Sequence, residues 1–257
     1  MFKNQRHIEI MAILKKEGFA EVRALSERLY ASQPTIRRDL SFLENQGYVR
    51  RSHGGVIPAD DTVNTPVAFR RGKRTTEKAR ICKLAATLLS RSSLVFIDAS
   101  TTAFHLAEHI KETDDIKVVT NGLPLCSVLA ENNVRTFSTG GKLVKSSMAF
   151  VGRQAENTVN GFNADLFFFS ASSFCEDGTI SDYSEEETAL RQTMHARASK
   201  SVFLCDEDKF NTVSAFTVFS LSDIDHIVTD VLLSESLLKE YGFTLQAQEN
   251  GAYLYSK

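Results

Sequence analysis

Apolar residues in the first fifty positions recur at helical spacing in three short blocks. Residues 5–16 and 22–30 form the first two blocks, each with inward-facing positions three or four residues apart. The third block begins at Ser32, which suits a helix cap because its hydroxyl can accept a hydrogen bond from an unpaired amide of the first turn. Along this helix we expect one buried stripe, formed by Ile36, Leu40 and Leu43. The pattern predicts three short helices.

The third predicted helix carries polar side chains off its apolar stripe, close to its N-terminal end. They are Gln33, Thr35, Arg37 and Arg38. Arg can make two hydrogen bonds to a guanine edge, Gln can pair with adenine, and Thr can bond to a base or touch a thymine methyl group. Arg37 and Arg38 point about 100° apart on a helix, so we expect one to reach a base and the other a phosphate. Asp39 is expected to hold one of the two arginines in place.

A basic hairpin is expected directly after the third helix. Gly47 ends the helix, and residues 49–55 combine basic side chains with a glycine-tipped turn. Three short helices and a hairpin match the layout of a winged helix-turn-helix, a DNA-binding fold. A pair of arginines alone is more often a solvated helix face. Its place inside a capped third helix, before a basic hairpin, favours DNA binding over that alternative.

The charge of the chain is unevenly distributed. The net charge is −2, but residues 1–80 carry a net +7 and residues 81–257 a net −9. A basic N-terminal part joined to an acidic remainder directs a polyanion such as double-stranded DNA to the N-terminal part.

The remaining composition favours a cytoplasmic protein. The four cysteines are scattered without metal-ligand spacing and are expected to be reduced core residues. The first residues lack the apolar core of a signal peptide, and no apolar run approaches the length of a membrane span. We therefore expect no membrane association.

A change of pattern divides the chain. Residues 58–76 offer few core positions and carry a basic run at 70–74, which we interpret as a solvated linker, with an extra phosphate contact as the alternative. The predicted domains are residues 1–57 and 77–257, joined by this linker. The second begins with a helix at 77–90, and then short apolar runs alternate with helical segments, which is typical of a parallel α/β sheet. The expected strands are 94–97, 117–120, 134–138, 166–169, 202–205 and 226–229; the expected helices are 102–110, 124–131 and 184–198.

Polar residues and glycines follow several of these strands, where open α/β sheets bind ligands. They are Asp98, Ser100, Thr101, Thr102, Asn121, Gly140, Gly141, Lys142 and Lys209. The hydroxyls after the first strand precede a helix, and a helix N-terminus binds anions through its free amides. The set predicts a site for a small phosphorylated polyol. It is not a Walker A loop, because no glycine precedes Gly141 by five residues.

The N-terminal segment resembles the DNA-binding domain of the DeoR family of bacterial transcription regulators. The resemblance covers nearly all of residues 1–57, and it rests on Arg6, Val22-x-x-Leu25, the run from Ser32 to Leu40, Gly47, and the run from Arg51 to Gly55. It implies DNA contacts by Arg6, Ser32, Arg51, His53 and Gly54, besides the four residues above. One departure is Ala31, where the family usually has Val.

The second segment, over roughly residues 75–232, resembles the effector domain of the same family, whose fold is similar to ribose-5-phosphate isomerase. The matching pieces include Asp98-x-x-Thr101-Thr102, Thr120-Asn121, Gly140-Gly141, Asp177-Gly178, Glu187 and Asp206-x-x-Lys209-Phe210. The resemblance implies a Rossmann-like α/β sensor in which residues 100–102 hold a phosphate, and Asp98, Glu187, Lys209 and Asp177 belong to the effector site. Ser100 stands where the family usually has Gly, so it either donates a bond to the ligand or narrows the pocket.

Two enzyme hypotheses are alternatives to a transcriptional regulator. A sugar-phosphate isomerase would need a carboxylate base, for which Glu187 or Asp177 could serve. The run from His105 to His109 fits the His-x-x-Glu-His zinc pattern if it lies on an α-helix. A fused DNA-binding domain argues against both, because sensors commonly reuse enzyme folds without the chemistry.

The sequence therefore predicts a cytoplasmic transcriptional regulator, a repressor of carbohydrate-metabolism genes that responds to a phosphorylated sugar. We expect no catalytic residue, metal or cofactor. One recognition helix reads only a few base pairs, so a homo-oligomer, a dimer or tetramer, is expected on the DNA operator.

Overall fold

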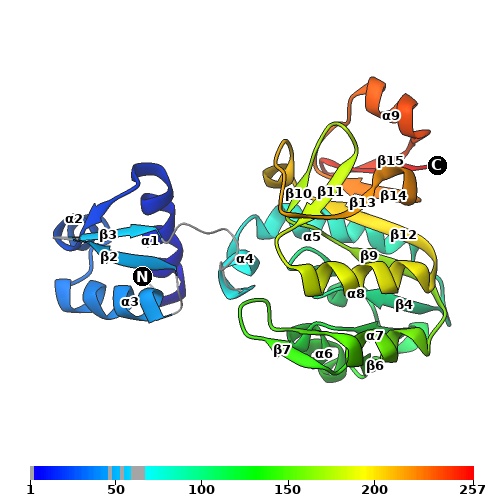
Figure 1. Ribbon diagram of the computed structural model, residues 1–257, viewed down its shortest axis with the longest axis horizontal. Coiled ribbons are helices and arrows are strands. Elements are labelled where there is room, and N and C mark those ends of the chain that lie inside the picture. The colour runs from blue at the N-terminus through cyan, green and yellow to red at the C-terminus, as the bar shows by residue number, and fades with distance from the viewer. Residues whose placement is uncertain (1–2, 46–47, 53–54, 59–66) are drawn as a thin grey trace. The chain divides into compact units, whose positions relative to one another are not determined.

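The computed structural model describes residues 3–45, 48–52, 55–58 and 67–257 (Figure 1). The chain forms two compact units, Met1–Lys73 and Arg74–Lys257. The division falls inside the predicted linker at 58–76. Part of that segment is helical, because α4 (Val67–Gly72) precedes the division and α5 (Thr75–Ala85) follows it.

The first unit contains the three predicted helices and the hairpin. Its elements are α1 (Lys3–Glu17), β1 (Ala20–Glu21), α2 (Val22–Arg28), α3 (Gln33–Asn45), β2 (Val49–Ser52) and β3 (Gly55–Pro58). The strands form an antiparallel sheet in the order β1-β3-β2, in which the short β1 was not predicted. The stripe of Ile36, Leu40 and Leu43 is fully buried, as predicted, and packs with Leu14 and Leu25.

An eight-stranded sheet organises the second unit, in the order β15-β16-β14-β12-β9-β4-β5-β6. Its six parallel strands are β4 (Leu94–Ile97), β5 (Lys117–Thr120), β6 (Arg135–Ser138), β9 (Ala164–Phe169), β12 (Ala198–Cys205) and β14 (His226–Thr229). All six were predicted. Two antiparallel strands that were not, β15 (Thr244–Glu249) and β16 (Ala252–Ser256), extend the sheet beyond β14.

The strand order indicates where a sheet of this kind would bind a ligand. In chain order the parallel strands lie 3-2-1-4-5-6 across the sheet, the doubly wound arrangement. The order reverses between β4 and β9, so the loops after these two strands diverge and leave a crevice at their carboxyl ends. The fold alone therefore points to the loops that begin at Asp98 and Ser170.

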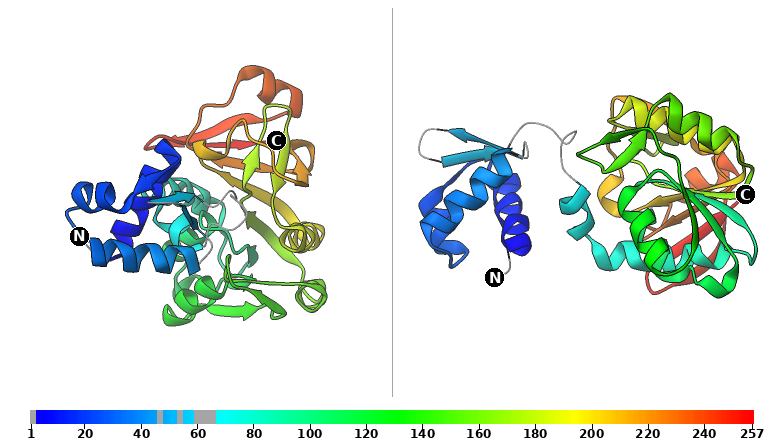
Figure 2. Two further views of the ribbon diagram at one scale, coloured as in Figure 1. Left: turned by 60° about the vertical axis from the view of Figure 1, so that its left-hand side comes forward. Right: turned by 90° about the horizontal axis from the view of Figure 1, so that it is seen from below.

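Helices cover both faces of this sheet (Figure 1; Figure 2). One apolar cluster joins the sheet to α5, the 3-10 helix η3 (Ala103–His109) and α6 (Leu123–Glu131). The other joins it to α7 (Arg153–Asn160), α8 (Glu185–Ala196) and α9 (Glu235–Tyr241). Phe167, Phe168 and Phe169 are all fully buried and alternate between the two clusters. The aromatic run is thus a central strand buried on both faces.

Smaller elements complete the second unit. They are the hairpin β7 (Lys142–Val144) and β8 (Ala149–Val151), the sheet of β10 (Ser173–Phe174), β11 (Thr179–Asp182) and β13 (Phe216–Ser220), and the 3-10 turns η2 (Ala86–Leu88), η4 (Glu112–Asp114), η5 (Glu207–Lys209) and η6 (Leu221–Asp223). Among the described residues, no helix is both long and apolar enough to cross a membrane.

The helix predicted at 102–110 is a 3-10 helix, η3, so the α-helix that the zinc pattern requires is not present there. Residues four apart lie on one face of an α-helix but about 120° apart on a 3-10 helix, which has three residues per turn. His105 and His109 therefore lack the shared face that the zinc pattern requires. His105 is buried and lies 3.3 Å from Glu108 through Nδ1. No group of His, Cys, Asp or Glu in the described part of the chain could hold a metal.

Candidate functional site

The N-terminal end of α3 presents the predicted DNA-reading side chains to solvent. The Ser32 hydroxyl accepts a hydrogen bond from the Thr35 amide at 3.4 Å and lies 2.8 Å from the Thr35 hydroxyl, as expected of a helix cap. Gln33, Arg37 and Arg38 are exposed. Neither arginine side chain has a hydrogen bond or ion pair within the described residues, so both guanidinium groups are available to an external partner.

Asp39 does not hold either of these arginines, and that prediction is wrong. The carboxylate is buried on the side of α3 that meets α1, where Oδ2 accepts a hydrogen bond from Nε of Arg6 at 2.5 Å and Oδ1 lies 2.9 Å from Nε2 of His7. Burial tends to raise the pKa of Asp39, but the bonds from Arg6 and His7 outweigh it and hold the pKa below its usual value. The charge cluster ties α1 to α3.

Two of the predicted DNA contacts have partners inside the first unit. Arg6 is largely buried in its ion pair with Asp39. Arg51 on β2 donates to Glu44 at 2.9 Å and to the Ser41 hydroxyl at 2.6 Å, which fastens the hairpin to α3. Direct DNA contacts by Arg6 and Arg51 stay predictions. His53 and Gly54, predicted at the tip of the hairpin, lie outside the described residues, as does Gly47.

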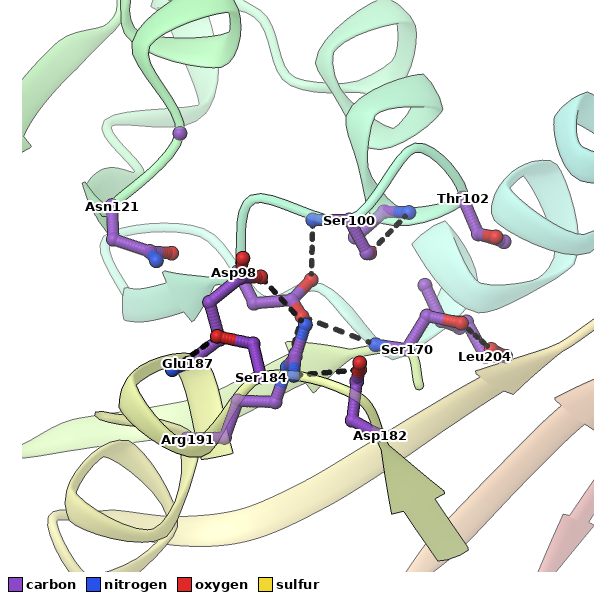
Figure 3. Close-up of polar contacts among 12 residues, drawn as sticks. Asp98, Ser100, Thr102, Asn121, Ser170, Asp182, Ser184, Glu187, Arg191 and Leu204 are labelled. Carbon is purple, nitrogen blue, oxygen red and sulfur yellow. Dashed lines mark hydrogen bonds and ion pairs between the residues drawn. The ribbon is translucent and has the colours of Figure 1, made fainter. Parts of the chain in front are cut away.

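In the second unit, Asp98 organises the turn between β4 and η3. Its Oδ1 accepts a hydrogen bond from the Ser100 amide at 3.0 Å, and its Oδ2 accepts one from Nε of Arg191 at 2.8 Å (Figure 3). The Ser170 amide, after β9, also donates to Oδ2 at 3.5 Å. Asp98 is only 1 % exposed. It joins the two loops at the switch point, and both of its oxygens already have protein partners.

Arg191 was not predicted, yet it lies at the centre of this site. Its guanidinium bonds to Asp98 and to Asp182 of β11, both at 2.8 Å, and to Glu187 at 3.4 Å (Figure 3). Burial opposes its charge, but the three carboxylates outweigh burial and raise the pKa of Arg191 above its usual value. Glu187 and Arg191 are four residues apart on a predicted helix, which could have suggested their pairing.

Two lysine ammonium groups donate hydrogen bonds to the hydroxyl groups that follow β4 and β9. Lys209 donates to the Thr102 hydroxyl at 3.0 Å and to the Ser170 hydroxyl at 2.5 Å. Lys78, on α5, donates to the Thr101 hydroxyl at 3.2 Å and is buried. Sequence reasoning missed Lys78, whose residue type and helical position carry no distinguishing signal. We call Ser100, Thr101, Thr102 and Ser170, with the two lysines, the hydroxyl–lysine cluster.

The Ser100 hydroxyl bonds to the backbone of the first residue of η3. It accepts a hydrogen bond from the Ala103 amide at 3.1 Å, so its own proton remains available to donate. The side chain that departs from the family's usual glycine is therefore used locally, and it can donate to a ligand as well.

The other predicted effector residues do not all lie beside the hydroxyl–lysine cluster. Asn121 is buried after β5; its Nδ2 donates to the Phe150 carbonyl at 3.1 Å, and its Oδ1 has no partner within the described residues. Gly140 and Gly141 have φ of +62° and +106°, which glycine adopts without strain. Lys142 is exposed and pairs with Glu186 at 2.9 Å. Asp177 is exposed and accepts from the Thr179 amide at 2.9 Å. No contact links Lys142 or Asp177 to the hydroxyl–lysine cluster.

An open surface pocket of about 460 Å³ lies elsewhere, at the amino ends of the parallel strands. Its lining includes Ser93, Asp165, Lys200 and His226. Ligands of open α/β sheets bind at the carboxyl ends of strands. The hydroxyl–lysine cluster, at that end, is therefore the stronger candidate.

Comparisons with known proteins agree with this architecture. The DeoR-like helix-turn-helix domain matches residues 6–62, and the DeoR C terminal sensor domain matches residues 73–231. The HTH-type transcriptional regulator GolR of Listeria innocua is 32 % identical over 94 % of this chain and 96 % of its own length. The glycerol-3-phosphate regulon repressor of Escherichia coli is 28 % identical over 90 % of this chain and 92 % of its own.

Among solved structures, ribose 5 phosphate isomerase A from Neisseria gonorrhoeae is 14 % identical to this chain, with a TM-score of 0.39 over 70 % of this chain and 74 % of that one. A likeness at this level carries no argument about function.

A winged helix with two free arginines, followed by an α/β unit with a polar site at its switch point, defines the class of DNA-binding transcriptional regulators with a separate sensor domain. The chain belongs to the DeoR family of these regulators. It is a transcriptional regulator and not an enzyme, so the isomerase alternative is set aside.

Proposed function

We propose that the protein is a repressor of carbohydrate-metabolism genes and that a small phosphorylated polyol or sugar controls it from the hydroxyl–lysine cluster. The main observation behind this proposal is a set of hydrogen bonds at the switch point. The ammonium groups of Lys78 and Lys209 donate to the hydroxyls of Thr101, Thr102 and Ser170. Ammonium and hydroxyl donors beside the first amides of a helical turn suit the oxygens of a phosphate.

The remaining groups suit the rest of such a ligand. Because both oxygens of Asp98 are already bonded, we assign it to shaping the turn. Asn121 Oδ1 is buried without a partner in the described chain, so it is available to accept from a ligand hydroxyl. Glu187, with one oxygen outside its bond to Arg191, is a second candidate acceptor.

On the DNA side, we propose that Gln33, Thr35, Arg37 and Arg38 enter the major groove of an operator. The exposure of Gln33, Arg37 and Arg38, the partial exposure of Thr35 and the freedom of both guanidinium groups support this role. Relatives named as repressors, including the glycerol-3-phosphate regulon repressor, support the sign of regulation. We propose that the protein binds as a homo-oligomer in the cytoplasm, because one recognition helix reads only a few base pairs.

A thermal-shift screen tests the effector site. The panel contains inorganic phosphate, glycerol 3-phosphate, and pentose and hexose phosphates, each sugar paired with its unphosphorylated form. A ligand that binds only the folded state raises the melting temperature by mass action. We expect a rise with at least one phosphorylated compound and none with its unphosphorylated partner.

The matched variants are Lys209→Ala and Lys142→Ala. Lys209→Ala should lose the rise and still bind DNA, whereas Lys142→Ala, which removes an exposed surface pair, should keep it. Equal responses of Lys209→Ala and wild-type protein would contradict the proposed site.

A further inference from the structure

Arg74 has an unusual backbone conformation at the start of the second unit. It is the residue before α5, and its φ of +50° and ψ of +42° are left-handed. Residues other than glycine adopt this conformation uncommonly. Such a conformation persists where surrounding contacts fix the residue, and it concentrates at functional positions.

Acidic side chains from two loops fix Arg74. Its Nη2 donates to Asp230, after β14, at 2.6 Å, and its Nη1 lies 3.2 Å from Glu207 and 3.5 Å from Asp208 of η5. The Asp230 carboxylate also accepts from the Glu207 backbone amide at 2.8 Å. The Arg74 and Asp230 side chains are 23 % and 9 % exposed, so their pair is shielded from water, whereas Glu207 and Asp208 are 68 % and 36 % exposed. The start of α5 is thereby fastened to η5.

The same short turn carries Lys209. η5 spans only Glu207–Lys209, and its first two side chains contact Arg74 while its third reaches the Thr102 and Ser170 hydroxyls. Lys209 also pairs with Asp206 at 3.2 Å. A phosphate at the hydroxyl–lysine cluster would compete for the ammonium protons that these groups now accept. Because Lys209 belongs to η5, a change in its hydrogen bonds affects the same turn whose side chains bind Arg74.

We infer that Arg74 transmits effector occupancy from η5 to the chain segment that leads to the DNA-binding unit. The preceding residue, Lys73, is the last of the first unit, so Arg74 is the covalent junction. Any ligand-dependent displacement of η5 acts on the junction through its ion pairs with Glu207 and Asp208. This inference rests on the proposed effector site, and it gives that site a physical route to DNA binding.

The variant Arg74→Asn tests the charge of the side chain apart from the backbone conformation. Asparagine is among the residues that most readily adopt the left-handed conformation, so the turn before α5 is retained while the guanidinium is removed. The matched control is Lys83→Gln on the same helix, because Lys83 forms an exposed pair with Glu249 at 2.5 Å, away from η5.

The assay is the fluorescence anisotropy of a labelled duplex, obtained by in vitro selection with the wild-type protein. It is titrated with each full-length protein, with and without the compound from the phosphate panel that gives the largest thermal shift. Coupling between two ligand sites is typically about 5–150-fold. We expect at least about a fivefold change in Kd for wild-type and Lys83→Gln protein, and less than about twofold for Arg74→Asn.

Thermal shift in the same proteins completes the test. Arg74→Asn should keep the wild-type rise with the panel compound. The Arg74 guanidinium bonds to Asp230 and to η5, and the bond of Arg74 to the cluster, from the Lys78 amide to the Arg74 carbonyl at 3.0 Å, is a backbone bond that the variant retains. A full Kd response in Arg74→Asn, or loss of its thermal shift, would overturn the transmitting role. A wild-type protein that no panel compound stabilises would instead refute the proposed effector site, and the inference with it.

Discussion

Replacing Arg191 by methionine tests whether the buried cation holds the switch-point loops together. The change leaves Asp98, Asp182 and Glu187, which are 1 %, 10 % and 13 % exposed, without their shared counter-charge. Removing one partner of a buried ion pair costs about 3–5 kcal/mol. The bonds to Asp98 and Asp182, both 2.8 Å long, account for most of this loss, since the third partner lies at 3.4 Å.

The expected loss is large enough to measure by urea unfolding. With a urea dependence of about 2 kcal/mol per molar, a loss of about 4 kcal/mol lowers the midpoint by about 2 M. Circular dichroism of the full chain follows the transition of the sensor unit, and two domains can give two transitions.

Lys142→Met is the matched control, because it also breaks an ion pair to α8, with Glu186, but at a side chain 67 % exposed. An exposed pair contributes about 0–1 kcal/mol. If Arg191→Met unfolded at the same urea concentration as Lys142→Met, the reasoning about the buried cluster would be refuted.

Three further predictions concern other parts of the chain. Asp39→Asn should destabilise the first unit by about 3 kcal/mol in urea unfolding, because Arg6 loses its buried partner. In wild-type protein the Asp39 contribution should be complete above its unfolded pKa and decline as pH falls through its lowered folded pKa. Arg37→Ala or Arg38→Ala should weaken specific duplex binding by about 1–3 kcal/mol for whichever side chain contacts a base. Gly178→Ala should lower the free energy of unfolding by more than about 1 kcal/mol, because φ is +79° and the new Cβ would lie 2.5 Å from the Tyr241 ring.

Each of these has a clear contrary result. Equal urea stability of Asp39→Asn and wild-type protein at neutral pH would mean that the carboxylate contributes nothing to folding. Gel shifts unaffected by both arginine substitutions would remove α3 from the DNA interface. Unchanged unfolding of Gly178→Ala would contradict the close approach of Tyr241.

Except for the exposed edge strand β6, the parallel strands were predictable because their buried positions form short apolar runs. Phe167–Phe169 is the clearest case. The strand β15 was missed because most of its side chains are polar and exposed at the sheet edge, which leaves no apolar run. The type of η3 was also missed, because helical spacing over seven residues does not distinguish 3-10 from α geometry.

The site was predicted in outline, from residue types at strand ends, and its charge pairing was not. Thr101, Thr102 and Lys209 lie together as the pattern suggested. Arg191 follows a run of glutamates, which by sequence alone indicates a solvated helix face. Its buried partners Asp98 and Asp182 are distant in the chain, and only the packing of α8 against the sheet brings them together. The same holds for Arg74 and η5.

The measurement that most directly tests the account is the affinity of the wild-type protein for its selected duplex, with and without each phosphorylated compound of the panel. We expect at least one of them to change Kd by about fivefold or more, and its unphosphorylated partner to leave Kd unchanged. An affinity that no phosphorylated compound alters, or that the unphosphorylated partner alters equally, would contradict the claim that this DNA-binding unit is controlled by a phosphorylated ligand.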